Sequence, residues 1–236
     1  MKIALASARV RDQDLAFNLT QMAKYLSMAK EQGADLVCFG EAQLQGFDSM
    51  TWDYETDRTM AVSWSSGMFQ ILAGWTRDSG VDLMFGFLER EGDAIYSSYA
   101  LISKGEVLQK YRRISRGWKV FWKTDGHYRE GNEVQVFQYR GRSCAVALCG
   151  DLWDSTDRFK LGEEILFWPV YVDYDPKEWK QKVRQEYAEK AAEVCRNVLM
   201  INPVDKDAKG GSCWFEIGAV RDALPMGEAG LLVVEI

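Results

Sequence analysis

Two residues that can act in covalent catalysis, a cysteine and a carboxylate, each follow an apolar run that predicts a buried strand. Cys149 stands at the end of such a run in "CAVALCGDLW" (144–153), directly before Gly150, and Glu41 follows "LVCFG". A thiol in a glycine turn can act as a nucleophile, and a partly desolvated carboxylate can act as its base. The same residues also allow a structural interpretation, with Cys149 as a small core hydrophobe and Glu41 as the first exposed residue of a loop.

The elements that must position these residues alternate between strand and helix periodicity, which is typical of α/β layers. No linker rich in Gly, Ser or Pro interrupts them, so residues 1–236 are predicted to form one domain. Helices are expected at 15–32, about 62–79 and 177–196. Strands are expected at 3–10, 35–41, 82–89, 96–103, 106–111, 133–138, 143–149, 165–170, 198–202, 212–217 and 230–236.

Composition excludes several classes of function. The 236 residues carry 29 Lys and Arg against 35 Asp and Glu, and this net charge of −6 argues against nucleic acid or an anionic membrane as partner. The N-terminus is too polar for a signal peptide, and no apolar run approaches the roughly 20 residues of a membrane span. Five cysteines without a CxxC pair indicate a reducing, cytoplasmic location. One histidine without clustered carboxylates predicts no metal site, and no nucleotide cofactor is implied.

Three separated motifs resemble the nitrilase or carbon–nitrogen hydrolase superfamily. They are "FGEAQLQGF", "GEVLQKYRRIS" and "VALCGDLWD", in that order, and the likeness continues through "LGEEILFWPVYVDYDPKEWKQKVRQEYAEKAAEVCRNVLMIN" to the C-terminal strands. The resemblance implies a four-layer α-β-β-α sandwich. It also implies cleavage of small amides, nitriles or carbamoyl compounds by a Glu, a Lys and a Cys through an acyl thioester. Relatives of this kind generally form homodimers or larger homo-oligomers.

The resemblance places Glu41 at the general-base position and Cys149 at the nucleophile position. Gly150 then supplies a backbone N–H to the oxyanion that forms when a thiolate attacks an amide. Asp151 matches the family's aspartate two residues beyond the cysteine, and we expect it to hold the turn by hydrogen bonds to the backbone. The arginine, aromatic, proline and glutamate that usually follow are replaced here by "LWDSTD".

The main departure from the family is Arg113 in "KYRRIS", where relatives have the catalytic lysine. A guanidinium can stabilise an oxyanion but cannot donate its proton usefully at neutral pH. If Arg113 acts only as a fixed positive charge, replacing it with Lys should raise turnover. Lys110 is a poor substitute, because three residues along an extended strand place it on the opposite face.

The family's second acid and its substrate pocket are less well defined by the sequence. Thr124 falls at the position of the second Glu, with Asp125 beside it and Glu130 nearby, and these alternatives stay open. His127 is expected to be a pocket or surface residue rather than a base. Positions that line the pocket in relatives match three residues in and directly after the strand predicted at 165–170, although these can equally be core: Trp168, Val170 and Tyr171.

These features predict a cytoplasmic hydrolase of small amides or carbamoyl compounds, with Cys149 as nucleophile and Glu41 as base. A rival from another class is a catalytically silent relative that kept the fold for binding or regulation. Arg113 and the missing second Glu favour that rival, whereas the retained Glu41 and Cys149 oppose it.

Overall fold

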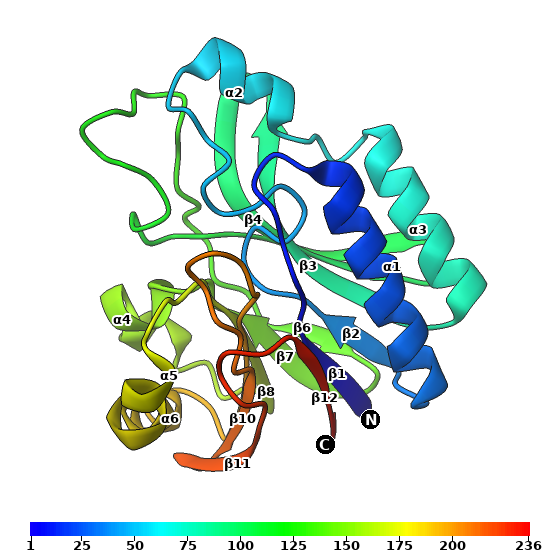
Figure 1. Ribbon diagram of the computed structural model, residues 1–236, viewed down its shortest axis with the longest axis vertical. Coiled ribbons are helices and arrows are strands. Elements are labelled where there is room, and N and C mark those ends of the chain that lie inside the picture. Colours follow the sequence, from blue (N-terminus) through cyan, green and yellow to red (C-terminus); the bar gives the residue numbers. More distant parts are fainter.

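Two six-stranded sheets pack face to face in the computed structural model of residues 1–236, and helices cover both outer faces (Figure 1). The first sheet has the order β12-β1-β2-β3-β4-β5, with β1 (Lys2–Ser7), β2 (Leu36–Cys38), β3 (Asp82–Glu91), β4 (Ala94–Ser103), β5 (Glu106–Arg112) and β12 (Gly230–Glu235). The second has the order β11-β10-β9-β8-β7-β6, with β6 (Phe137–Tyr139), β7 (Arg142–Val146), β8 (Ile165–Pro169), β9 (Asn197–Ile201), β10 (Cys213–Glu216) and β11 (Ala219–Ala223).

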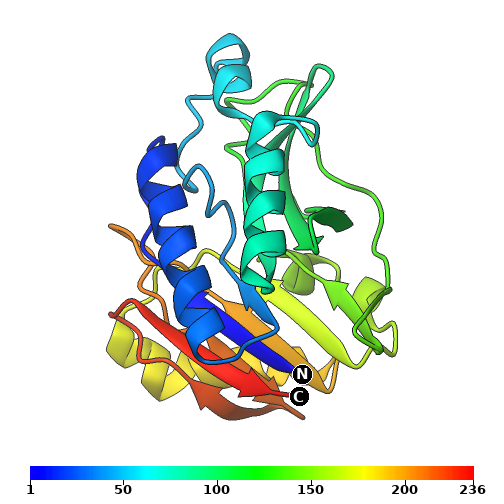
Figure 2. The ribbon, with the colours of Figure 1, turned by 90° about the vertical axis from the view of Figure 1, so that its right-hand side faces the viewer.

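The helices complete the four layers. α1 (Leu15–Glu31) and α3 (Gly67–Ser79) run side by side over the first sheet, and α2 (Tyr54–Met60) lies beyond one end of it (Figure 2). The second sheet carries α4 (Asp151–Asp154), a 3₁₀ turn (Thr156–Phe159), α5 (Pro176–Glu178), a π-helical turn (Trp179–Val183) and α6 (Arg184–Ala192). The predicted α-β-β-α sandwich is therefore confirmed. None of the helices combines the length and apolar character that crossing a membrane requires.

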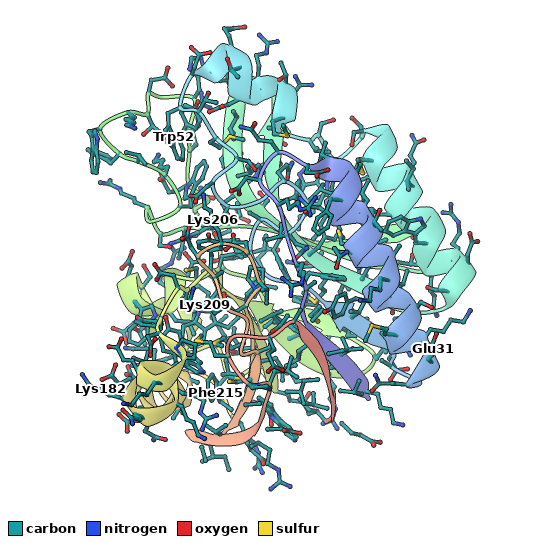
Figure 3. All side chains as sticks on the ribbon, in the orientation of Figure 1. Glu31, Trp52, Lys182, Lys206, Lys209 and Phe215 are labelled. Carbon is teal, nitrogen blue, oxygen red and sulfur yellow. The ribbon has the colours of Figure 1, made fainter.

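Alternation along β1 explains how one sheet serves two cores. Ile3 and Leu5 face the second sheet and join the inter-sheet core, whereas Ala4 and Ala6 face the helices. Successive side chains of a strand point to opposite faces, so a strand buried on both sides is apolar throughout. Side chains from both sheets fill the space between them, while the labelled Glu31 and Lys182 project outward (Figure 3).

Helix α1 begins and ends close to the predicted bounds because its ends carry the expected signals. The side chain of Asp14 accepts a hydrogen bond from the Phe17 N–H at 3.0 Å, which caps the first turn. Gly33 follows the last turn with a φ of 69°, a conformation that favours glycine. The side chains of Met22 and Ala29 are fully buried against the sheet.

Helix α3 begins at Gly67 rather than near residue 62, and α2 was not predicted at all. The reason for the late start is that Val62 lies extended beside β3. Its N–H donates to the Leu88 carbonyl at 2.9 Å, and its carbonyl accepts from the Arg90 N–H at 3.0 Å. The helix predicted over 177–196 begins instead at Pro176, contains the π-helical turn and ends at Ala192.

Two edge strands also differ from the prediction. The strand expected at 133–138 is mostly wrong, because residues 133–136 form no strand and β6 starts at Phe137. The alternating Val134 and Val136 produced that pattern without a pairing partner. β11 was not predicted because its residues are largely exposed and lack an apolar pattern.

A buried carboxylate at the start of β8 makes stability depend on pH. Glu163 is 5% exposed and neither of its side-chain oxygens has a hydrogen-bond partner. Burial raises the pKa of this carboxyl, so the folded protein favours its protonated form. This group's contribution to stability is therefore complete below the unfolded pKa of about 4.3 and is lost as pH rises through the folded pKa.

We expect Glu163→Gln to stabilise the protein at neutral pH and to have less effect in mild acid. A gain of about 1 kcal/mol would raise Tm by about 2–4 °C in a chain of this size. Thermal unfolding of both proteins across that pH range checks this. An equal shift at every pH would contradict the titration argument.

Candidate active site

The candidate active site lies where loops leave the ends of β2, β5 and β7. Cys149 follows β7 and continues its ladder, since its N–H donates to the Pro169 carbonyl at 2.8 Å. The Trp168 indole N–H donates to the Cys149 carbonyl at 2.9 Å. The chain turns sharply at this point, because Cys149 has a φ of 44°, a left-handed conformation that non-glycine residues adopt at some energetic cost.

Glu41 follows β2 and is 1% exposed, so the alternative that it starts an exposed loop is wrong. Its Oε1 accepts from the Ser97 hydroxyl at 2.9 Å. Arg113 Nη1 donates to both carboxylate oxygens, at 2.9 and 3.1 Å. A buried carboxylate is stable only when charge and hydrogen bonds compensate it, and both are present here.

Arg113 follows β5 directly and makes two further hydrogen bonds. Its N–H donates to the Ser97 carbonyl at 2.9 Å, and its Nε donates to the Ser115 hydroxyl at 2.7 Å. The residue is 3% exposed. Burial is the largest single influence and opposes the charge, but Glu41, Cys149 and Asp151 together outweigh it, so the pKa of Arg113 is raised further above its usual range. The guanidinium is thus a permanent positive charge in this site.

Asp151 connects the cysteine turn to the arginine segment. Its Oδ2 accepts from the Leu148 N–H at 2.8 Å and from the Tyr111 hydroxyl at 2.6 Å. Its Oδ1 accepts from the N–H groups of Ile114 and Ser115, at 3.1 and 2.8 Å. The predicted hydrogen bonds to the turn are present, and the same carboxylate also binds the neighbouring segment.

The Cys149 thiol is protonated at neutral pH. Burial raises its pKa to about 11, the charge of Glu41 adds to this effect, and Arg113 opposes it. Sγ lies 3.8 Å from the Tyr171 carbonyl oxygen, which can accept its proton in a weak hydrogen bond. A nucleophile in this state needs a base at the moment of attack, and Glu41 is the carboxylate whose charge acts most strongly on this thiol.

Cys149 is expected to be the first of the five thiols to react with iodoacetamide, because it is partly exposed whereas the other four are buried. Its alkylation rate should rise about tenfold per pH unit without a plateau near the ordinary thiol pKa of about 8.5, because only the thiolate reacts. Peptide mapping at limiting reagent measures the order of labelling. Labelling of Cys38 or Cys195 with Cys149 untouched would contradict the assignment.

Several residues singled out from the sequence lie elsewhere. Lys110 is on the opposite face of β5, as expected, with its Nζ 4.7 Å from the centre of the Trp64 ring. Asp125 and His127 are not brought to Glu41, Arg113 or Cys149. They hydrogen-bond to each other at 2.9 Å on the surface, and the His127 ring stacks on Tyr54.

The other two alternatives for the second acid make no hydrogen bond or ion pair with these three residues. Thr124 hydrogen-bonds to the Phe121 carbonyl at 3.3 Å, within its own loop. Glu130 forms an ion pair with Lys119 at 2.8 Å. Neither contacts Glu41, so the structure singles out no second acid from the sequence.

The three predicted pocket residues divide between core and site. Trp168 is fully buried and stacks on Tyr187, and Val170 is buried in the same core. Trp168 also supports the cysteine turn, through its hydrogen bond to the Cys149 carbonyl. Tyr171 is partly exposed, its ring stacks on Phe47 at 4.2 Å, and its carbonyl faces Cys149 Sγ. Of the three, Tyr171 has the most direct access to a bound molecule.

Sequence reasoning missed Ser97, Ser115 and Tyr111, which orient the charged groups. Tyr111 shares a face with Arg113 because it lies two residues earlier on the same strand, and this spacing could have identified it. Ser97 has no comparable signal, because it reaches Glu41 only through the pairing of β2, β3 and β4. Ser115 lies in an irregular segment whose path the sequence does not specify.

The two stacked sheets, with a buried Glu, an arginine and a cysteine at one end, form the arrangement that the carbon–nitrogen hydrolase motifs predict. The sequence profile described as "Carbon-nitrogen hydrolase" matches residues 2–235, and the chain belongs to this family. It is similar to the glutamine-dependent NAD(+) synthetase of Thermotoga maritima, with 26% identity over 171 residues, covering 70% of this chain and 28% of the synthetase. The chain thus spans less than a third of that relative's length.

Solved structures show the same fold. The glutamine-dependent NAD+ synthetase from Acinetobacter baumannii superposes with a TM-score of 0.79 at 21% identity, covering 98% of this chain and 44% of that one. A mutant amidase from Nesterenkonia sp. AN1, with acrylamide added to its active-site cysteine, superposes with a TM-score of 0.77 at 20% identity, covering 100% and 93%. The nitrilase-type sandwich predicted from the sequence motifs is therefore shown at the level of family and fold.

Proposed function

We propose that this chain hydrolyses a small amide or carbamoyl compound through an acyl thioester on Cys149. The observation that carries the proposal is the buried Glu41–Arg113 pair beside the strained cysteine turn. The family membership adds the class of reaction, and the amidase that matches over 93% of its length favours amides over nitriles.

In the first half of the reaction, Cys149 transfers its proton to Glu41 while sulfur bonds to the amide carbon. The carbonyl oxygen becomes an oxyanion, for which two sources of N–H groups are in place. The Gly150 N–H has no partner within the protein, and Arg113 Nη2 has none either. When the C–N bond breaks, Glu41 returns the proton to the leaving nitrogen and ammonia departs.

In the second half, Glu41 takes a proton from water, whose oxygen adds to the thioester carbon. The same N–H groups stabilise the second oxyanion. The C–S bond then breaks, Glu41 returns the proton to sulfur, and the carboxylic acid leaves. Arg113 contributes charge throughout and transfers no proton, which is consistent with its raised pKa. One carboxylate therefore moves every proton in the cycle.

Ammonia release from a panel of small amides and carbamoyl compounds tests this function. We expect the wild type to hydrolyse at least one compound that the Cys149→Ala variant does not hydrolyse. Equal, background-level release by both proteins over the whole panel would favour the silent binding protein instead.

A further inference from the structure

The guanidinium of Arg113 is enclosed by small residues and uses only part of its hydrogen-bonding capacity. Nε is bound by Ser115 and Nη1 by Glu41, so Nη2 is the one nitrogen without a partner. Nη2 points toward two glycines. A Cβ atom on Gly117 would lie 2.9 Å from it, and one on Gly150 would lie 2.8 Å from it. No larger residue fits at either position while the guanidinium stays in place.

Ser115 is fixed against the turn that carries the nucleophile. It is 3% exposed, and its own N–H donates to Asp151 Oδ1 at 2.8 Å. A Cβ atom on Gly150 would lie 3.1 Å from its hydroxyl oxygen, so the hydroxyl is packed beside that residue. We use the name Arg113 socket for Ser115, Gly117 and Gly150 together.

We propose that Ser115 is a positioning residue that makes arginine effective at this place in the site. A guanidinium is planar, so two of its nitrogens fix the direction of the third. Glu41 holds Nη1 and Ser115 holds Nε, so that Nη2 lies beside Gly150, whose N–H is also without a partner and can donate to the same anion. This inference rests on the proposed function, because the anion at these two donors is the oxyanion of the reaction.

The Arg113 socket reverses what the sequence led us to expect of Arg113→Lys. A lysine has no Nε, so the Ser115 hydroxyl would lose its donor, and a single ammonium cannot reach Glu41 and the Gly150 turn in the same geometry. We therefore expect Arg113→Lys to lower kcat rather than raise it. In the Arg113→Lys variant, Ser115 no longer has a guanidinium to orient.

The experiment compares kcat and KM for the wild type, Ser115→Ala, Arg113→Lys and the double variant, on the amide that releases ammonia. Loss of one oxyanion donor costs about 10²–10³ in kcat, and we expect misdirection of Nη2 to cost about 10-fold or more, with KM within about twofold. In the Arg113→Lys background, Ser115→Ala should change kcat by less than about twofold.

Ser98→Ala is the matched control. Ser98 lies on β4 and, like Ser115, is a buried serine whose hydroxyl bonds to a charged side chain; it donates to the Glu89 carboxylate at 2.6 Å, on the face away from the site. Its loss should lower Tm about as much as Ser115→Ala does and leave kcat unchanged. Similar losses of kcat in both variants would show a general structural effect and would overturn the inference.

If Arg113→Lys has no measurable turnover, rescue by a small cation replaces the double variant. Guanidinium ion should restore part of the turnover of Arg113→Ala, and ammonium ion at equal ionic strength should not. Without the Ser115 hydroxyl, in Arg113→Ala/Ser115→Ala, that rescue should weaken. Equal rescue in both variants would contradict a role for Ser115.

The two proposals fail in distinguishable ways. An active wild type whose kcat is unchanged by Ser115→Ala, or reduced equally in both backgrounds, overturns the positioning role alone. A wild type that releases no more ammonia than Cys149→Ala removes the proposed function and this inference with it.

Discussion

Glu41→Gln is expected to reduce kcat by about 10²–10⁴, because an amide can neither accept the proton of Cys149 nor return it to the leaving group. The variant keeps the size of the side chain but removes the charge that compensates Arg113. Removing one partner of a buried ion pair costs about 3–5 kcal/mol of stability. Both effects are measured on one sample, by ammonia release and by urea unfolding.

Glu89→Gln separates the two effects. Glu89 is also fully buried and paired with an arginine, Arg112, on the other face of the same strands. We expect a comparable loss of stability from Glu89→Gln and an activity within a few-fold of the wild type. If Glu41→Gln retains full activity, Glu41 is not the base and the proposed proton path is wrong.

Asp151→Ala is expected to reduce stability about as much as Glu41→Gln does. Four donors lose their acceptor, and each buried donor left unsatisfied costs about 1–3 kcal/mol, with overlap between them. We expect the free energy of unfolding to fall by about 3–5 kcal/mol. Because the carboxylate joins the cysteine turn to the Arg113 segment, turnover of the remaining folded protein should fall as well.

Asp57→Ala is the matched control for Asp151→Ala. Asp57 is 1% exposed and also accepts four hydrogen bonds, from the Thr51 N–H and hydroxyl, the Trp52 N–H and the Tyr128 hydroxyl. It should cost similar stability and affect turnover less than Asp151→Ala. If both variants lose turnover equally, Asp151 has no special link to the site.

The fold was predictable because its strongest signals are local. Contiguous residues determine the caps and the apolar face of α1. The same holds for the neighbouring strands that are buried on both faces. β11 and β6 are edge strands, one largely exposed and one short, and their pairing depends on neighbours that are distant in the chain. The π-helical turn at 179–183 has no sequence signal that we can identify.

The candidate site was predictable only where the family motifs reach. Glu41, Arg113 and Cys149 were assigned from the family motifs, and the structure brings them together. Their partners depend on register and on irregular backbone, as for Ser97 on β4 and Ser115 beyond β5. The orientation of Arg113, on which we expect turnover to depend, therefore could not be predicted from the sequence.

The mass of the intact protein after incubation with fluoroacetamide or acrylamide tests the central claim most directly. A mutant of the Nesterenkonia sp. AN1 amidase carries the acetamide moiety of fluoroacetamide on its active-site cysteine, and we therefore choose these compounds as probes. We predict one adduct per chain, mapped to Cys149 in the wild type and absent from Cys149→Ala. An unmodified wild type, or an adduct on another cysteine, would contradict the assignment of Cys149 as the nucleophile.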